Sequence, residues 1–251
     1  MSELKEVIDK INKYLTDKGY KDDSPDSTGS KMKLLDEYRE AILDYNEKVN
    51  ITRIVERDDF ERRHYIDSLM CCISDEFLSA RNIIDIGSGG GFPGVPLAIM
   101  FPEKVFVLMD SSGKRMKIVQ EIVSDMGICN VRTIHGRAEE LGRNEEYREK
   151  FDLCVSRAVA SMPTLSEYCL PFVKVDGSFI AYKGPGSDDE IAGADKAIST
   201  LGGKIIRTEE AAGTVFSADG NEGHRLVYII KESPTPSKYP RGGGKPSKKP
   251  L

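Results

Sequence analysis

The sequence IIDIGSGGGFPG, residues 83–94, joins a short apolar run to a cluster of glycines. An apolar run that ends in glycines is typical of a buried parallel strand followed by a tight turn into a helix. Glycine is needed at such a turn where the backbone takes positive φ values and where a ligand approaches it closely. We therefore expect a nucleotide-like ligand across the glycines, although a purely structural turn would use them too.

The glycines fit two different motifs. Gly89, Gly91 and Gly94 fit G-x-G-x-x-G, the dinucleotide fingerprint. Gly87, Gly89 and Gly91 fit an acid-x-G-x-G-x-G pattern that begins at Asp85. The second frame gives Asp85 a purpose, because a carboxylate inside an apolar strand is costly unless it has a partner or faces a cleft. We prefer the second frame, but this stretch alone does not decide between the two.

From residue 81 onward the chain alternates between predicted strands and helices. We predict strands at 82–86, 104–110, 130–134, 151–156, 177–182, 204–208 and 226–231, with helices between the first six. This alternation predicts an α/β fold with a seven-stranded, mostly parallel sheet, to which a final hairpin adds one antiparallel strand. In such sheets a ligand binds at the carboxyl ends of the strands.

The chain divides into three predicted parts. Residues 1–80 carry helical patterns and form an N-terminal helical cap, and residues 81–232 form the sheet domain. Residues 233–251 form a basic tail that we expect to be flexible, because it is rich in Pro, Gly and Lys. The net charge is −5, yet the stretch 231–251 has six basic residues and one acid, so it carries +5 and the rest carries −10. A basic tail on an acidic body favours a nucleic-acid partner.

The composition also excludes several classes of protein. Five cysteines, an odd number without C-x-x-C spacing, argue for reduced thiols rather than a disulfide framework. Three scattered histidines argue against a structural zinc site. The sequence has no run of eighteen apolar residues and no signal-peptide core at its start. We therefore expect a cytoplasmic protein without a bound metal or a membrane segment.

The end of the second predicted strand carries further candidates. Asp110 follows Gly91 by 19 residues, where a carboxylate can accept both hydroxyls of a ribose. It would also serve as a helix cap, but the glycine loop upstream favours ribose. Lys114 and Arg115 fall in the first turn of the next helix, where cations oppose the helix dipole. This placement indicates a nearby polyanion or, equally well, a solvated face.

The later strand ends supply the remaining candidates. Arg157 closes the fourth predicted strand, and its planar guanidinium suits a guanine edge or a phosphate, the alternative being a salt bridge. Neither an NPPY-type nor a Pro-Cys sequence occurs there, which argues against an exocyclic amine acceptor and a cysteine nucleophile. Lys183 ends the fifth strand on the same rim. Glu139, considered alone, is most simply the acidic first turn of a helix.

Taken together, these segments resemble the glucose-inhibited division protein B family, the ribosomal RNA small subunit methyltransferase G family. The resemblance rests on IDIGSGGGFPGVPLAI (84–99), MDSSGKRMKIVQE (109–121), GRAEEL (136–141), FDLCVSRAVASM (151–162) and RRHYIDSL (62–69). It covers about residues 46–231 and most of the tail. It implies a Rossmann-like class I methyltransferase domain that uses S-adenosylmethionine to methylate N7 of one guanine in bacterial 16S rRNA.

The resemblance also implies roles for individual residues. Cofactor contacts fall on Gly87, Phe92, Ala138, Glu139 and Arg157, to which our interpretation of the loop and the ribose corner adds Gly89 and Asp110. Arg157 is the expected catalytic residue, which braces the cofactor and the guanine edge at once. No general base is expected, because N7 of guanine exposes a lone pair, and proximity and orientation can supply most of the acceleration.

RNA contacts are expected from His64, Lys114, Arg115, Lys183 and Arg241. His64 and Asp67 would close the mouth of the pocket or, alternatively, pack helices together. The basic tail and the Lys114–Arg115 pair would bind phosphates of the small ribosomal subunit or its precursor. We expect the enzyme to be a monomer.

Three other functions stay open on the sequence alone. An NAD-dependent oxidoreductase would suit the G-x-G-x-x-G frame and Asp110, but an obvious hydride-transfer constellation such as Tyr-x-x-x-Lys is missing near the site. A non-catalytic RNA- or ribosome-binding module could retain the loop. A small-molecule methyltransferase is also possible, because the loop identifies the cofactor and not the acceptor.

Overall fold

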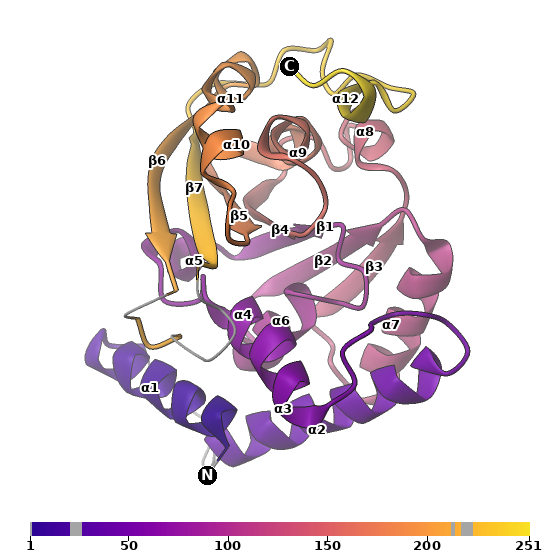
Figure 1. Ribbon diagram of the computed structural model, residues 1–251, viewed down its shortest axis with the longest axis vertical. Helices are drawn as coiled ribbons and strands as arrows, with labels where there is room; N and C mark the ends of the chain where they lie inside the picture. The colour runs from indigo at the N-terminus through magenta and orange to yellow at the C-terminus, as the bar shows by residue number, and fades with distance from the viewer. Residues whose placement is uncertain (1, 21–26, 212–213, 217–222) are drawn as a thin grey trace.

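The computed structural model describes residues 2–20, 27–211, 214–216 and 223–251. A seven-stranded sheet with the order β3-β2-β1-β4-β5-β7-β6 forms its centre (Figure 1). The strands are β1 (Asn82–Ile86), β2 (Val105–Asp110), β3 (Val131–His135), β4 (Phe151–Arg157), β5 (Val173–Lys183), β6 (Gly203–Glu210) and β7 (Arg225–Lys231). β7 is antiparallel to both of its neighbours, whereas β1 to β5 pair in parallel. The predicted α/β architecture with one antiparallel strand is confirmed.

Helices cover both faces of this sheet, and the central strands are accordingly mostly apolar. They are α6 (Gly94–Met100), α7 (Gly113–Asp125), α8 (Ala138–Leu141), α9 (Met162–Cys169), η2 (Leu170–Phe172), α10 (Asp188–Ala192) and α11 (Asp195–Thr200). Ile83 joins the core beneath α6 and α7, whereas Ile84 joins the core beneath α9 and α11. Successive strand residues point to opposite faces, so β1 contributes to both cores.

The N-terminal segment is helical and packs on the first of these cores. It contains α1 (Glu3–Asp17), α2 (Ser27–Asn46), α3 (Arg57–Phe60), the π-helical turn η1 (Glu61–Ile66), α4 (Asp67–Leu69) and α5 (Asp75–Ser79). The apolar face of α1 is buried, and the Tyr38 hydroxyl of α2 donates to the carbonyl of Gly90 at 2.8 Å. Helix α2 therefore touches the glycine loop directly.

The C-terminal tail differs from the flexible segment that we predicted. Residues 233–251, which include the short helix α12 (Lys245–Lys248), lie against α8 and α9 (Figure 1). Arg241 pairs with Glu167 of α9 at 2.6 Å, and the Glu167 side chain is fully buried. Arg148 donates to the carbonyls of Thr235 (2.6 Å) and Tyr239 (2.9 Å). The tail has too few apolar residues for a core of its own, but its backbone carbonyls and Arg241 bond to side chains of the sheet domain.

Candidate active site

The glycine loop follows β1 without an intervening residue. Gly87, Gly89 and Gly91 have φ angles of 77°, 58° and 85°, a region that glycine adopts far more readily than other residues. A Cβ at Gly87 would collide with Val159, and one at Gly91 would collide with the Tyr38 hydroxyl. The backbone therefore requires the glycines of the acid-x-G-x-G-x-G frame, the frame that we preferred.

Asp85 holds the two ends of this loop together. Its side chain is fully buried, and its Oδ2 accepts from the Ser88 hydroxyl at 2.7 Å and from the Gly94 N–H at 2.9 Å. Burial nevertheless raises the pKa of Asp85 to about 7. Within the described part of the chain, its Oδ1 has no hydrogen-bond partner. A buried polar atom of this kind is costly unless a ligand or a proton satisfies it.

Asp110 links the glycine loop to the end of β2. Its Oδ2 accepts from the Gly89 N–H at 3.0 Å, and its Oδ1 accepts from the Ser112 N–H at 2.8 Å. The cap of α7 is Ser112, whose hydroxyl accepts from the Arg115 N–H at 3.4 Å. The alternative role of Asp110 as that cap is therefore wrong. Its carboxylate instead fixes the corner between two strand ends.

The end of β3 completes this side of the site. His135 pairs with Asp110 in the sheet, and the Gly136 N–H donates to the Asp110 carbonyl at 3.1 Å. Ala138 and the buried Glu139 then begin α8. The predicted cofactor residues of β1, β2 and β3 consequently lie at adjacent carboxyl ends of the sheet. We call this group, made of Gly87, Gly89, Asp110, Ala138 and Glu139, the cofactor side.

Arg157 lies at the carboxyl end of β4 and binds the helical segment that carries the RRHYIDSL sequence. Its Nη1 donates to Asp67 Oδ2 at 2.5 Å and to the Arg63 carbonyl at 2.7 Å. Its Nη2 donates to Nδ1 of His64 at 3.2 Å. The His64 ring in turn stacks on Phe92 of the glycine loop, with centroids 4.3 Å apart. The structure therefore brings together His64, Asp67, Phe92 and Arg157, four residues that the sequence analysis singled out separately.

The charge states in this cluster have clear physical causes. Burial, reinforced by the Arg157 charge, lowers the pKa of His64 to about 3, so the imidazole is neutral. Its Nε2 then donates to the Thr52 hydroxyl at 2.8 Å while Nδ1 accepts from Arg157. Burial alone would raise the pKa of Asp67, but the hydrogen bond from His224 and the Arg157 charge outweigh it, and the pKa lies below its ordinary value.

His224 is a site residue that our sequence reasoning missed. Its Nδ1 lies 2.8 Å from Oδ1 of Asp67, and this bond raises the pKa of His224. The two residues are 157 positions apart. The one signal in the sequence was a histidine two residues before the last predicted strand, and such a position alone does not identify a partner.

These side chains line a cavity of about 580 Å³, which we call the acceptor cavity. Its lining also includes Arg63, Arg225 and Lys183, and Lys183 pairs with Glu190 at 3.0 Å. Cations outnumber carboxylates on these walls, so the cavity favours an electron-rich or anionic guest. His64 and Lys183 are the two predicted RNA contacts found here.

Lys114, Arg115 and Arg241 lie elsewhere. Lys114 and Arg115 begin α7, where the Arg115 side chain donates to the Asn50 carbonyl at 3.5 Å. Arg241 is held in its ion pair with Glu167. These three cations are therefore outside the acceptor cavity, and their predicted contact with RNA would be made across a wider surface.

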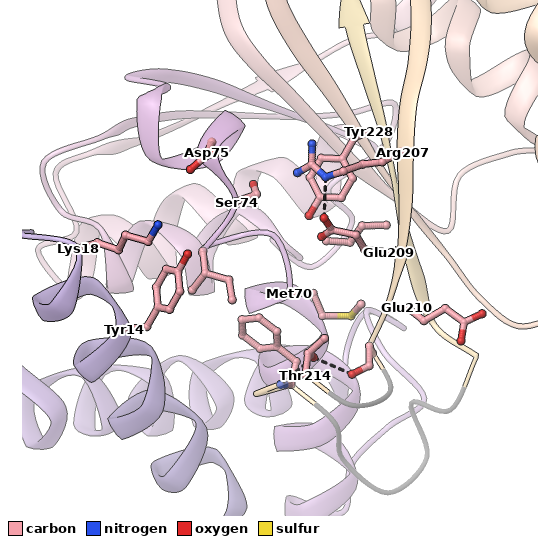
Figure 2. A pocket seen from close by; sticks show the side chains of 14 residues that line it. Tyr14, Lys18, Met70, Ser74, Asp75, Arg207, Glu209, Glu210, Thr214 and Tyr228 are labelled. Carbon is pink, nitrogen blue, oxygen red and sulfur yellow. Dashed lines mark hydrogen bonds and ion pairs between the residues drawn. The ribbon is translucent and has the colours of Figure 1, made fainter.

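A second cavity, of about 500 Å³, lies between α1 and the β6–β7 hairpin. Figure 2 shows Tyr14 and Lys18 on one side and Arg207 on the other. The Arg207 guanidinium lies 3.6 Å from the Tyr228 ring centroid and binds Glu76 and Glu209. None of the predicted site residues lines this cavity, and its arginine is already neutralised, so it does not resemble the acceptor cavity.

A metal-binding cluster and a membrane-spanning helix are both absent from the described ranges. No three His, Cys, Asp or Glu residues there come together to hold a metal ion. None of the described helices is long and apolar enough to cross a membrane.

Comparisons with known proteins show the family and the fold of the chain. The family model for rRNA small subunit methyltransferase G matches residues 31–214. The ribosomal RNA small subunit methyltransferase G of Clostridium novyi (strain NT) is 48% identical over 215 residues, which cover 86% of this chain and 87% of that protein. Its counterpart from Alkaliphilus metalliredigens (strain QYMF) is 44% identical over 214 residues, with coverages of 85% and 88%. An O-methyltransferase from Bacillus cereus, solved in complex with SAH, shares the fold with a TM-score of 0.53 and 16% identity, over 77% of this chain and 90% of that one.

Proposed function

The chain belongs to the rRNA small subunit methyltransferase G family, and from this premise we propose that it methylates N7 of one specific guanine in bacterial 16S rRNA, within the small ribosomal subunit or its precursor. The activity common to the family is S-adenosylmethionine-dependent methylation of rRNA, carried by a Rossmann-like class I fold. The predictions of family, fold and cofactor are confirmed.

The cofactor side fits S-adenosylmethionine. The positive-φ glycines let a ligand approach the backbone, and the unpaired Oδ1 of Asp85 leaves a buried acceptor beneath the loop. Gly87, Gly89 and Phe92 would hold the cofactor at the loop, and Asp110 would accept the ribose hydroxyls. Ala138 and Glu139 would meet the adenine edge. The bound cofactor supplies an electrophilic methyl group on its sulfonium.

Arg157 would position the acceptor base. Three of its donor hydrogens bind Asp67, His64 and the Arg63 carbonyl, and a guanidinium has five. The remaining donors have no partner among the described residues, so they are free to bind O6 of a guanine, which lies beside N7. Because Asp67 and the Arg63 carbonyl fix the orientation of the guanidinium, little side-chain freedom remains to be lost on binding.

A base that removes a proton is not needed in this cavity, because N7 of guanine carries a lone pair and no hydrogen. His64 agrees with that requirement: it is neutral, and both of its ring nitrogens are engaged. Its role would be to support Arg157 and to pack against Phe92. Orientation of the acceptor nitrogen toward the methyl group would then supply most of the rate enhancement.

Contacts with the RNA backbone would come from surface cations. Lys114 and Arg115 lie at the start of α7, and the tail presents Lys245, Lys248 and Lys249 to solvent. Phosphate contacts of this kind position an RNA without reading its sequence. We assign them to the exposed lysines of the tail rather than to Arg241, because Arg241 is already paired with Glu167.

The family relation together with the Arg157 cluster carries this proposal. The test is transfer of a labelled methyl group into small-subunit RNA from a strain that lacks the gene, followed by digestion to nucleosides and mass spectrometry. We expect a new 7-methylguanosine. A different methylated nucleoside would refute the N7 assignment, and tight binding of S-adenosylhomocysteine without transfer to RNA would favour a small-molecule acceptor or a non-catalytic role.

A further inference from the structure

His224 lines the acceptor cavity next to β7, across the Asp67 carboxylate from Arg157 of β4. Its Nδ1 binds Oδ1 of Asp67, and Arg157 binds Oδ2 of the same carboxylate. The two donor side chains therefore flank one region of the cavity, held by the two oxygens of a single buried group. The His224 ring is partly exposed, and within the described ranges its Nε2 has no hydrogen-bond partner.

The bond to Asp67 determines which atom of His224 faces the cavity as a donor. Since Asp67 is an acceptor, Nδ1 carries a hydrogen in both the neutral and the protonated imidazole, and protonation adds a second N–H at Nε2. Asp67 raises the pKa of His224, against burial and the charges of Arg157 and Arg63. The charged groups that share the cavity with it are Asp67, Arg157, Arg63, Arg225, Lys183 and Glu190.

We propose that His224 is a specificity-determining residue, which selects guanine by donating its Nε2–H to O6 of the acceptor base beside Arg157. This inference rests on the proposed function. Guanine presents the acceptors N7 and O6 on one edge, whereas adenine presents N7 and the donor N6 amine. Arg157 and His224, both held by the Asp67 carboxylate, can donate to O6 of guanine. Adenine would instead place its N6 amine, itself a donor, against them. Donors left unpaired in this way cost free energy when they are desolvated.

His224→Asn and His224→Gln separate this role from a structural one. The Asn amide keeps a donor near the position of Nδ1 for Asp67 but removes the atom at Nε2. The longer Gln amide can present a donor to the cavity and lacks the fixed bond to Asp67. A purely structural His224 would tolerate Asn better than Gln, whereas recognition of O6 requires the reverse order in kcat/KM. S-adenosylhomocysteine affinity should stay at the wild-type value in the Asn variant, and the thermal unfolding midpoint should fall only slightly, because the Asn amide keeps a neutral hydrogen bond to Asp67.

The decisive measurement compares two substrates. One is the natural RNA, and the other carries 2-aminopurine riboside, which lacks O6, at the guanosine located by nucleoside mapping. We expect the loss of O6 to lower kcat/KM at least about tenfold in the wild type, as a lost charged hydrogen bond would. The factor should be smaller in His224→Asn, where only the Arg157 contact to O6 remains to be lost. Wild-type kcat/KM should also fall as pH rises through the pKa of His224, a limb that the Asn variant lacks.

If the removal of O6 lowers kcat/KM by the same factor in the wild type and in His224→Asn, the proposed role of His224 is wrong, but the proposed methyltransferase function stands. Absence of 7-methylguanosine with the unaltered protein would instead overturn the proposed function and this inference together. The two failures are therefore distinguishable in one set of assays.

Discussion

The cofactor side and the acceptor cavity are built in different ways. On the cofactor side, Asp85 bonds to Gly94 only nine positions away, and Gly89 bonds to Asp110 at the end of the next strand. In the acceptor cavity, Asp67 bonds to Arg157 over 90 positions and to His224 over 157. The first is thus fixed by the local backbone. The second exists only because the helical segment before β1 packs on the ends of β4 and β7.

Asp67→Ala should have the largest effect of these changes, and the effect should be confined to the acceptor cavity. Removing this buried carboxylate leaves the half-buried Arg157 and His224 without their shared partner, which should cost about 1–3 kcal/mol, less than the loss of a fully buried pair. Denaturant unfolding would measure the loss, and calorimetry with S-adenosylhomocysteine would measure the cofactor side. Asp67→Asn, which keeps the shape and one acceptor oxygen, is the matched control with a smaller loss.

We expect methyl transfer to collapse in Asp67→Ala while the folded protein still binds S-adenosylhomocysteine. A parallel loss of cofactor affinity in the folded variant would mean that the two sides are one cooperative unit. The acceptor cavity would then not be separable from the cofactor side.

Neutralising the tail should weaken RNA binding without touching the cofactor. Lys245, Lys248 and Lys249 changed together to Gln remove three phosphate contacts, which should flatten the slope of log affinity against log salt by about 2–3. The measurement is RNA affinity between about 50 and 200 mM salt, where three contacts correspond to about a 20- to 40-fold change.

The control uses three exposed lysines of α1 and α2, Lys10, Lys13 and Lys33. These two helices lie at the opposite end of the molecule from the tail (Figure 1). The same charge removed there should leave the salt slope unchanged. Equal slopes for both triple variants would show that the tail acts only through net charge, and its docked position would have no role in binding.

Gly89→Ala should have the smallest effect on folding and a selective effect on the cofactor. Gly89 has φ of 58°, and a Cβ there would lie 4.0 Å from its nearest neighbouring atom, whereas Gly127 has φ of 69° with open space around it. Alanine at either position should cost about 1–2 kcal/mol for the left-handed backbone. Only Gly89→Ala should also weaken S-adenosylhomocysteine binding, as measured by calorimetry. Equal affinities in the two variants would contradict a close approach of the cofactor to Gly89.

Residues at the ends of predicted strands can be placed together from the sequence for a physical reason. Gly87, Gly89, Asp110 and Arg157 follow or end predicted strands, so strand ends that meet at one edge of a parallel sheet place them together. His224 could not be found in this way. It reaches Asp67 because β7 inserts antiparallel between β5 and β6, and strand order is not written in the local sequence.

The tail shows the same limit of prediction from the local sequence. Its composition correctly indicates that it cannot form a core alone, but composition says nothing about a surface that it can bind. The docking depends on Glu167, a buried carboxylate of α9 whose partner Arg241 lies 74 positions away. A long-range ion pair of this kind leaves no periodic or compositional signal in either segment.

The most direct test of the proposed site is the turnover of Arg157→Ala with small-subunit RNA at saturating S-adenosylmethionine, with thermal unfolding measured on the same preparation. Arg157 lies between the acceptor cavity and the glycine loop, since it bonds to Asp67 and its Cζ lies 5.7 Å from the centroid of the Phe92 ring. We predict a folded protein whose formation of 7-methylguanosine is at least about tenfold slower, a barrier increase of about 1.4 kcal/mol or more. Methylation at the wild-type rate by folded Arg157→Ala would contradict the central role of this arginine.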